Sequence, residues 1–69
     1  MQRTPVSSSN VASVGYDLDS STLEIEFNNG AVYQYFDVNE NVYNELIQAT
    51  SVGGYLAANI KGKYRFSRV

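Results

Sequence analysis

The 69-residue sequence contains no cysteine, no histidine and only one proline. Without cysteine there is no disulfide to stabilise a small fold and no thiolate to act as a nucleophile or zinc ligand. Without histidine the chain lacks the usual general base at neutral pH and the commonest ligand of transition metals. We therefore predict a non-catalytic protein that uses no cofactor and no metal ion.

Long apolar runs are absent as well. The first ten residues, MQRTPVSSSN, lack the apolar stretch of about seven or more residues found in a signal peptide. No window approaches the roughly 18 apolar residues of a membrane-spanning helix. We expect a soluble, cytoplasmic protein with no membrane partner. Residues 1–8 are expected to form a flexible arm, and residues 9–69 a single domain.

Charge of one sign is scarce in each part of the chain. Residues 1–50 hold all seven acidic residues and only one of the five bases, Arg3, whereas residues 51–69 hold the other four bases and no acid. Such asymmetry can mark a contact face for an anionic partner. The alternative, which we favour, is that the basic tail packs beside the acidic strands and neutralises them.

Two early segments show the alternation of polar and apolar residues that is typical of β-strands. TLEIEF, residues 22–27, alternates strictly, and SVGYDL, residues 13–18, alternates less regularly. The cluster DSS between them predicts a turn. The residues expected on the apolar side of these two strands are Val14, Tyr16, Leu18, Leu23, Ile25 and Phe27.

The segment NNG at 28–30 predicts a hairpin, and the length of its loop decides which side chains the next strand buries. A two-residue loop places Gln34 on the apolar side. A three-residue loop, with the glycine as a bulge, pairs Phe27 with Ala31 and turns both tyrosines of YQY, residues 33–35, to the apolar side. Since a slip of one residue moves every side chain across the sheet, we predict the register that keeps glutamine out of the core.

After the third strand the apolar spacing becomes helical. NENVYNELIQAT predicts a helix that Asp37 or Asn39 caps at its start. A second, shorter helix is expected to begin at Ser51 and to stop at Gly62. KYRFSRV at the C-terminus alternates again and forms either a closing edge strand or an ordered tail. The predicted fold is α+β: an antiparallel three-stranded β-meander followed by two helices packed on one face, with or without a short fourth strand.

These segments together resemble the KTSC domain, a family named for the C-terminus of some lysyl-tRNA synthetases that also occurs as free-standing small bacterial proteins. The resemblance runs from about Ser8 to Val69. Its motifs are SSNV (8–11), VGYD (14–17), LEIEF (23–27), Gly30, the central Tyr33-x-Tyr35, ATSVG (49–53) and IKGKYRF (60–66). Asn39 stands where the family pattern has a proline. The resemblance implies no catalytic residue, and the synthetase association suggests RNA binding.

The aromatic residues have two interpretations, a stacking platform or a core. Stacking contributes ~1–3 kcal/mol per base, and burying a large side chain stabilises by ~1.5–3 kcal/mol. A chain of this length has a total stability of only about 3–10 kcal/mol. We therefore predict that most of the rings are core, while Tyr35 stays a candidate for stacking. The predicted aromatic core consists of Tyr16, Phe27, Tyr33, Tyr35, Tyr64 and Phe66.

The basic C-terminal segment is the main candidate for a binding site. On a strand, Lys63 and Arg65 would point outward together, with Lys61 and Arg68 close by, and such a patch neutralises phosphates. A charged edge strand is also an ordinary protection against sheet-to-sheet aggregation.

A weaker candidate is TSVGG at 50–54. Ser51, Gly53 and Gly54 stand where free N–H groups at a helix start could hold an anion. The alternative is a tight turn that lets the two helices approach each other.

The sequence thus predicts a small non-catalytic binding module. The first hypothesis is an accessory RNA-binding domain that contacts tRNA or single-stranded RNA weakly and salt-sensitively through the C-terminal bases. The second is a protein-interaction or homodimerisation module that uses the open sheet face or an unpaired edge.

Overall fold

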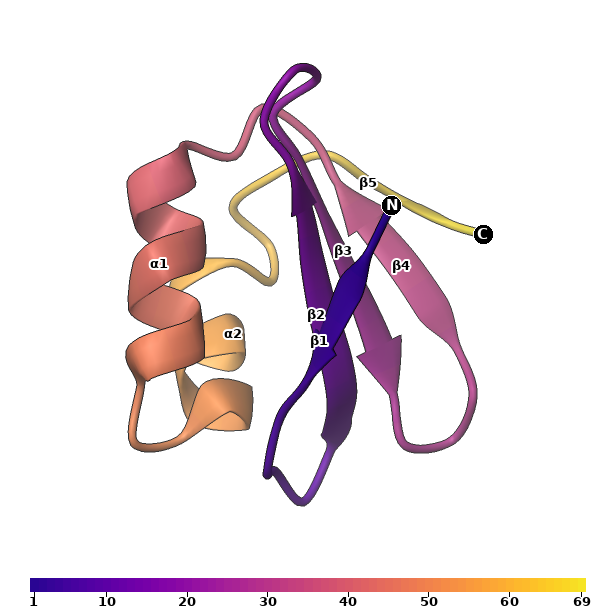
Figure 1. The fold of residues 1–69 in the computed structure, drawn as a ribbon, viewed down its shortest axis with the longest axis vertical. Helices are drawn as coiled ribbons and strands as arrows, with labels where there is room; N and C mark the ends of the chain where they lie inside the picture. Colours follow the sequence, from indigo (N-terminus) through magenta and orange to yellow (C-terminus); the bar gives the residue numbers. More distant parts are fainter.

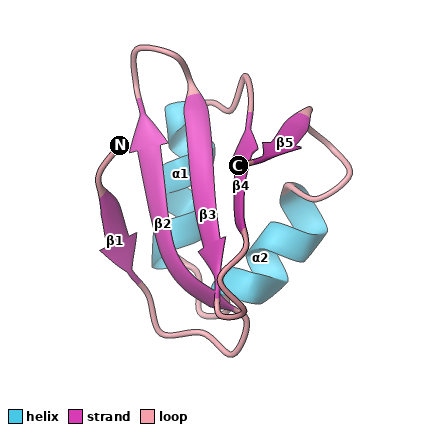
Figure 2. Ribbon diagram, turned by 90° about the vertical axis from the view of Figure 1, so that its right-hand side faces the viewer, coloured by secondary structure: helices cyan, strands magenta, loops and turns pink.

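The computed structural model describes residues 1–69 and shows one antiparallel sheet with two helices. The elements in chain order are β1 (Arg3–Pro5), β2 (Val11–Asp17), β3 (Thr22–Phe27), β4 (Val32–Tyr35), α1 (Glu40–Gln48), α2 (Val52–Asn59) and β5 (Phe66–Arg68). Both helices cover the same face of the sheet (Figure 1), and the other face is open, with the helices behind it (Figure 2). The predicted α+β class is confirmed, but the sheet has five strands in the order β1-β2-β3-β4-β5.

The first additional strand lies in the segment that we expected to be a flexible arm. Arg3–Pro5 form β1, which pairs antiparallel with β2 and places Arg3 opposite Gly15. Gly15 has a steric reason to be glycine, because a Cβ atom there would lie 2.6 Å from the carbonyl oxygen of Gln2. The flexible arm predicted for residues 1–8 therefore contains a strand, β1, which was not predicted. It fits beside β2 because Gly15 has no side chain there.

The β3–β4 hairpin has the register that the sequence predicts. The N–H of Phe27 donates to the carbonyl oxygen of Ala31 at 2.8 Å, and Gly30 adopts a φ of 92°, which glycine tolerates without strain. Leu23 lies opposite Tyr35 and Ile25 opposite Tyr33. Both tyrosines therefore project from the side of the sheet that the helices cover.

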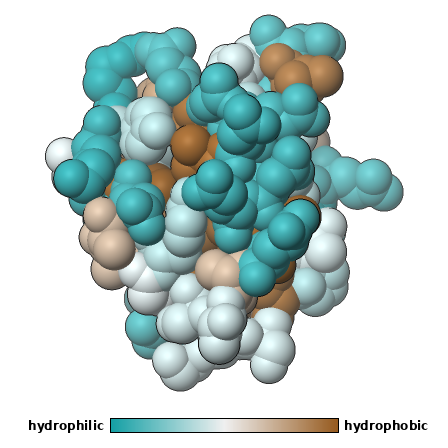
Figure 3. All heavy atoms as spheres, turned by 90° about the vertical axis from the view of Figure 1, so that its left-hand side faces the viewer, coloured by the Kyte–Doolittle hydropathy of each residue, from teal (hydrophilic) through white to brown (hydrophobic).

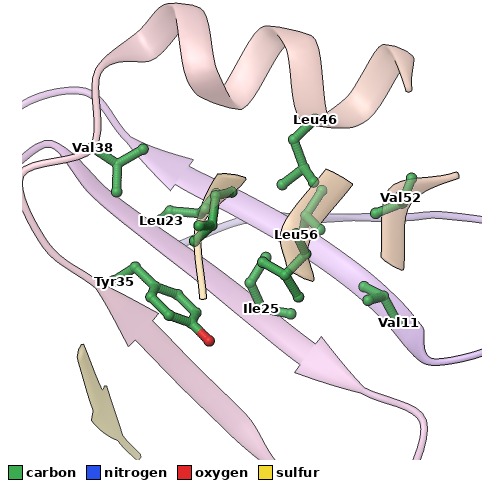
Figure 4. Close-up of a cluster of buried hydrophobic side chains, with 10 residues drawn as sticks. Val11, Leu23, Ile25, Tyr35, Val38, Leu46, Val52 and Leu56 are labelled. Carbon is green, nitrogen blue, oxygen red and sulfur yellow. The ribbon is translucent and has the colours of Figure 1, made fainter. Parts of the chain in front are cut away.

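The core fills the space between that sheet face and the helices. Figure 4 shows side chains of β2, β3 and β4 meeting those of α1 and α2. The core residues are Val11, Val14, Leu23, Ile25, Tyr35, Val38, Leu46, Val52, Leu56 and Ile60. Leu18, expected on the apolar side, is 61% exposed because it lies in the turn after β2 rather than in the strand.

The helix boundaries follow from their caps. Asn39, not Asp37, caps α1: its side-chain oxygen accepts the N–H of Asn41 at 2.8 Å. The hydroxyl of Ser51 caps α2 by accepting the N–H of Gly54 at 3.0 Å. Neither helix has the length and apolarity needed to cross a membrane. The surface on the helical side is mostly hydrophilic, and hydrophobic residues show only in small separate patches (Figure 3).

Candidate functional site

The six rings predicted as core differ widely in burial. Tyr35 is buried, at 4% exposure. Four others are partly buried and pack against the core: Tyr16, Phe27, Tyr33 and Tyr64. The prediction is wrong for Phe66, which is 58% exposed, because β5 is an edge strand and its side chain meets neighbours only on the β4 side.

Several of these rings line a groove beside β4 and β5, at the edge of the molecule where β5 and α2 lie (Figure 2). The groove has a volume of about 480 Å³. Its lining residues are Phe27, Asn29, Ala31, Tyr33, Tyr35, Lys61, Gly62, Phe66 and Arg68. Four of them are aromatic, two are cationic and none is acidic, so we call it the aromatic–cation groove.

The four rings of the groove form a continuous series of contacts. Phe27 meets Tyr33 edge-on, with centroids 5.7 Å apart and an interplanar angle of 87°. Phe66 contacts both central tyrosines, at 5.9 Å and 45° to Tyr33 and at 5.9 Å and 39° to Tyr35. These are favourable geometries for ring pairs. The exposed ring of Phe66 is therefore held by two neighbours that are themselves anchored in the core.

Tyr35 contributes its polar end to the groove although its ring is buried. It lines the groove, and its hydroxyl makes no hydrogen bond within the protein and is not among the fully enclosed polar atoms. Burial, together with the neighbouring phenol of Tyr33, raises the pKa of Tyr35 above its ordinary value. The hydroxyl therefore keeps its proton at neutral pH and is available as a hydrogen-bond donor. Ring stacking on a ligand by Tyr35, one of our predictions, is incompatible with this burial.

The four bases predicted as one patch are divided between different surfaces. Lys61 and Arg68 line the groove, and the ammonium group of Lys61 lies 5.2 Å from the centre of the Phe27 ring. Lys63 is exposed and does not line the groove. Arg65 lies opposite Phe36, with its guanidinium 5.5 Å from that ring. The groove therefore contains two of the four predicted cations.

Among the four bases of the C-terminal segment, Arg65 pairs with an acidic side chain, as expected if this segment neutralises the acidic part of the chain. Its guanidinium donates to a carboxylate oxygen of Asp37 at 2.8 Å, and the side chains are 75% and 77% exposed. An ion pair so exposed contributes ~0.2–1 kcal/mol and weakens in salt. Arg65 thus tethers the start of β5 to the end of β4 instead of offering a free charge to a partner.

The predicted anion site at the start of α2 has a structural role. The Ser51 hydroxyl is already occupied by the N–H of Gly54. At Gly53, an added Cβ atom would lie 3.5 Å from the Ser8 hydroxyl and 3.6 Å from the amide nitrogen of Asn10. These residues place the loop before β2 against the first turn of α2. The arrangement favours close packing over anion binding, but Gly53 packs against the loop before β2 and not, as predicted, against the other helix.

The open face of the sheet carries acids whose oxygens have partners within the chain. A carboxylate oxygen of Glu24 accepts from the Gln34 amide at 2.9 Å, and its other oxygen lies 3.4 Å from Arg3. Glu26 accepts from the Ser13 hydroxyl at 2.9 Å. The structure brings no three acidic side chains together in a group that could hold a metal ion.

Comparison with known proteins assigns the family. The KTSC domain model matches residues 7–64. The chain belongs to the KTSC domain family. A crystal structure of a KTSC domain protein from Yersinia pestis superposes with a TM-score of 0.94 and 42% identity, covering 99% of this chain and 96% of that chain. An uncharacterized protein of Stutzerimonas stutzeri is 37% identical over 100% of this chain and 99% of its own length.

A KTSC domain also occurs within a much larger enzyme. A lysine–tRNA ligase of Nostoc punctiforme is 41% identical over 54 residues, which are 78% of this chain but only 10% of the ligase. A second ligase, from Trichormus variabilis, matches over the same shares at 41% identity. The resemblance predicted from the sequence motifs is thus confirmed.

Part of the groove in this KTSC domain was not predicted from the sequence. Phe66 was predicted as core, and Asn29, Ala31 and Gly62 were not predicted as lining residues. The hairpin loop and the turn after α2 are far apart in the sequence, and only the fold brings them to one edge. The alternation of ring and cation in KYRFSR was the one available signal, and it marks the right segment without showing which side chains share a face.

Proposed function

We propose that this KTSC domain is a non-catalytic accessory module that binds RNA through the aromatic–cation groove. The observation that carries the proposal is the composition of the groove, which combines four rings and two cations with no carboxylate among nine lining residues. Rings offer surfaces on which bases stack whatever the sequence, and cations neutralise phosphates. A carboxylate in such a groove would repel the phosphates, and here the acids lie elsewhere.

The charge of the whole domain limits how strong this binding is. The net charge is −2 and the isoelectric point about 4.7, so no general attraction draws nucleic acid to the surface. If Lys61 and Arg68 neutralise about two phosphates, the logarithm of the binding constant falls with a slope of about −1.4 against the logarithm of salt for a single strand. Affinity should then drop roughly sevenfold between about 50 and 200 mM salt.

The occurrence of a KTSC domain in lysine–tRNA ligases supports the proposal, since the name of these enzymes gives tRNA as a substrate. The ligase match covers a small part of the enzyme, so aminoacylation is not part of the proposal for this chain. The proposal includes the cytoplasmic location predicted from the sequence.

Fluorescence anisotropy with a labelled single-stranded RNA at two salt concentrations tests the proposal. Lys61→Gln and Arg68→Gln should each weaken binding, because each removes a cation of the groove. Lys63→Gln is the matched control, since it removes the same charge two residues away from Lys61 and outside the groove. Equal losses in Lys61→Gln and Lys63→Gln, or no binding by the wild type at low salt, would contradict the proposal.

A second candidate function is association through the free edge of the sheet. The N–H of Val69 donates to the carbonyl of Val32, and the carbonyl of Arg65 accepts from the N–H of Phe36, directly after β4. In an antiparallel pair such bonds involve every second residue, so the backbone groups of Phe66 and Arg68 point away from β4. Free edge groups can pair with another strand. Light scattering over a concentration series measures whether the protein associates with itself, and a constant monomer mass would exclude a homodimer formed in this way.

A further inference from the structure

One ring of the groove differs from the others in having a large free surface. Phe66 is 58% exposed, yet its orientation is fixed by contacts with Tyr33 and Tyr35, both with centroids at 5.9 Å. An exposed ring on a flexible tail would have to be ordered when a ligand binds, at a cost in side-chain entropy. A ring already held against two anchored rings avoids most of that cost.

The strand register places a cation at a defined distance from this ring. Phe66 lies opposite Tyr35 and Arg68 opposite Tyr33, so both side chains project from the same face of the sheet. Two residues on one strand are separated by about 7 Å. A base and the phosphate of the same nucleotide are separated by a comparable span, with the ribose between them.

The second cation lies farther along the same direction. Lys61 sits over Phe27, which bonds to Ala31, two residues before Tyr33 on the hairpin. Ring, guanidinium and ammonium therefore follow one another from the Phe66 end of the groove to the Phe27 end. Rings line the whole groove, and its two cations lie toward the Phe27 end, away from Phe66.

We infer that the ligand unit of the aromatic–cation groove is one unpaired nucleotide, whose base stacks on Phe66 while its phosphate lies between Arg68 and Lys61. This inference rests on the proposed function and adds to it the class of nucleic acid: single strands, loops and ends instead of duplexes. In a duplex the bases are stacked on one another and are not available to a protein ring. The volume of about 480 Å³ is in the range of small-molecule sites and suits a single nucleotide unit.

A nucleotide of this kind is supplied either by an RNA strand or by a free nucleoside monophosphate, and the test separates the two sources. Amide chemical shifts of the full chain are followed during titration with adenosine monophosphate, adenosine, inorganic phosphate, a single-stranded RNA and a duplex of the same sequence. Shifts at residues of the groove are expected with the monophosphate and the single strand. Adenosine should bind more weakly than the monophosphate, and inorganic phosphate and the duplex should leave the groove unchanged.

Two matched variants test the role of the exposed ring. Phe66→Leu should weaken binding of the single strand by about 5- to 150-fold, which is the range for removing one base–ring stack. Phe36→Leu makes the same change on the other face of the sheet and should change affinity less than twofold. The amide spectrum of each free variant shows whether the fold is retained, and Phe66→Tyr, which keeps a ring, should restore binding.

The outcomes distinguish this inference from the proposed function. Two results would overturn the inference and leave RNA binding in place. One is equal affinity for duplex and single strand. The other is a Phe66→Leu variant that binds RNA as well as the wild type while Lys61→Gln binds it more weakly. Binding of the monophosphate that depends on Phe66, without binding of any RNA, would support the nucleotide site and overturn the RNA function. Absence of binding by every probe at low salt would overturn both.

Discussion

Truncation of two neighbouring rings, Tyr35→Ala and Phe66→Ala, tests whether the structure divides the aromatic residues between stability and binding. The two side chains are in contact, with centroids 5.9 Å apart. Tyr35 is 4% exposed and Phe66 58% exposed. An aromatic ring is therefore removed at two adjoining positions that differ in burial and in the hydroxyl group of Tyr35.

The expected losses of unfolding free energy follow from that difference. Truncating a buried aromatic side chain to alanine costs ~3–5 kcal/mol, because it removes apolar contacts and leaves a cavity. Phe66 buries somewhat less than half of its surface, which corresponds to about 0.6–1.3 kcal/mol. Its two ring contacts, taken at about 0.5 kcal/mol each for a ring that is mostly exposed, raise the total to about 1.6–2.3 kcal/mol.

These losses must be compared with a total of about 3–10 kcal/mol for a domain of this length. Tyr35→Ala should leave the domain partly unfolded or close to unfolding at room temperature. Phe66→Ala should remain folded. The assay is urea unfolding monitored by circular dichroism. The midpoints of the variants and the wild type can be compared only if their slopes of unfolding free energy against urea concentration agree.

The result that refutes the reasoning is a Phe66→Ala loss equal to or larger than that of Tyr35→Ala. Such a result would mean that the exposed ring carries as much stability as the enclosed one. The assignment of Phe66 to ligand binding would then lose its basis, because a residue needed for folding gives no separate information about function.

Three further predictions concern single residues. The pKa of Tyr35 in the folded protein is raised above 10, the ordinary value for tyrosine, so the unfolded chain loses this proton first as the pH rises. The contribution of Tyr35 to stability is therefore complete below pH 10 and falls above it. Tyr35→Phe should reduce this fall in alkaline unfolding curves. Asn39→Ala should destabilise by about 1 kcal/mol by removing the cap of α1, whereas Asn41→Ala, exposed on the same helix, should stay within about 0.5 kcal/mol in urea unfolding. Gly15→Ala should displace β1, since its Cβ would meet the Gln2 carbonyl at 2.6 Å; hydrogen exchange should then speed up at the β1–β2 amides, and unchanged protection there would contradict the steric argument.

The central hairpin could be predicted from the sequence because two independent signals agree there. Loop chemistry permits two registers, and only one of them keeps Gln34 out of the core. In the structure Gln34 lies opposite Glu24 and donates to it at 2.9 Å. Neither the alternation of polar and apolar residues nor the cost of burying an amide determines the hairpin register alone, but the two together do.

β1 could not be predicted in this way, and the strand at β5 was predicted only as one of two alternatives, because each of these outer strands has only three residues. An alternating pattern needs more positions than that to be recognised. β1 also depends on its neighbour, since the space for it exists only where Gly15 has no side chain. Pairing of this kind is a tertiary property, and the segment before Val6 carries no local signal for it.

The division of the basic segment shows why a cluster in the sequence is not yet a surface. Arg65 and Arg68 are three residues apart, so on a strand they project from opposite faces, and the structure gives Arg65 to Asp37 and Arg68 to the groove. Lys61 joins Arg68 from the turn after α2, because that turn passes beside Phe27. The cations that line the groove together are therefore the outer two of the four, so the groove holds half of the positive charge that this segment of the sequence offers. A variant that neutralises only Lys63 and Arg65 should leave most of the affinity for an anionic ligand, although by sequence alone it would be the natural choice for abolishing it.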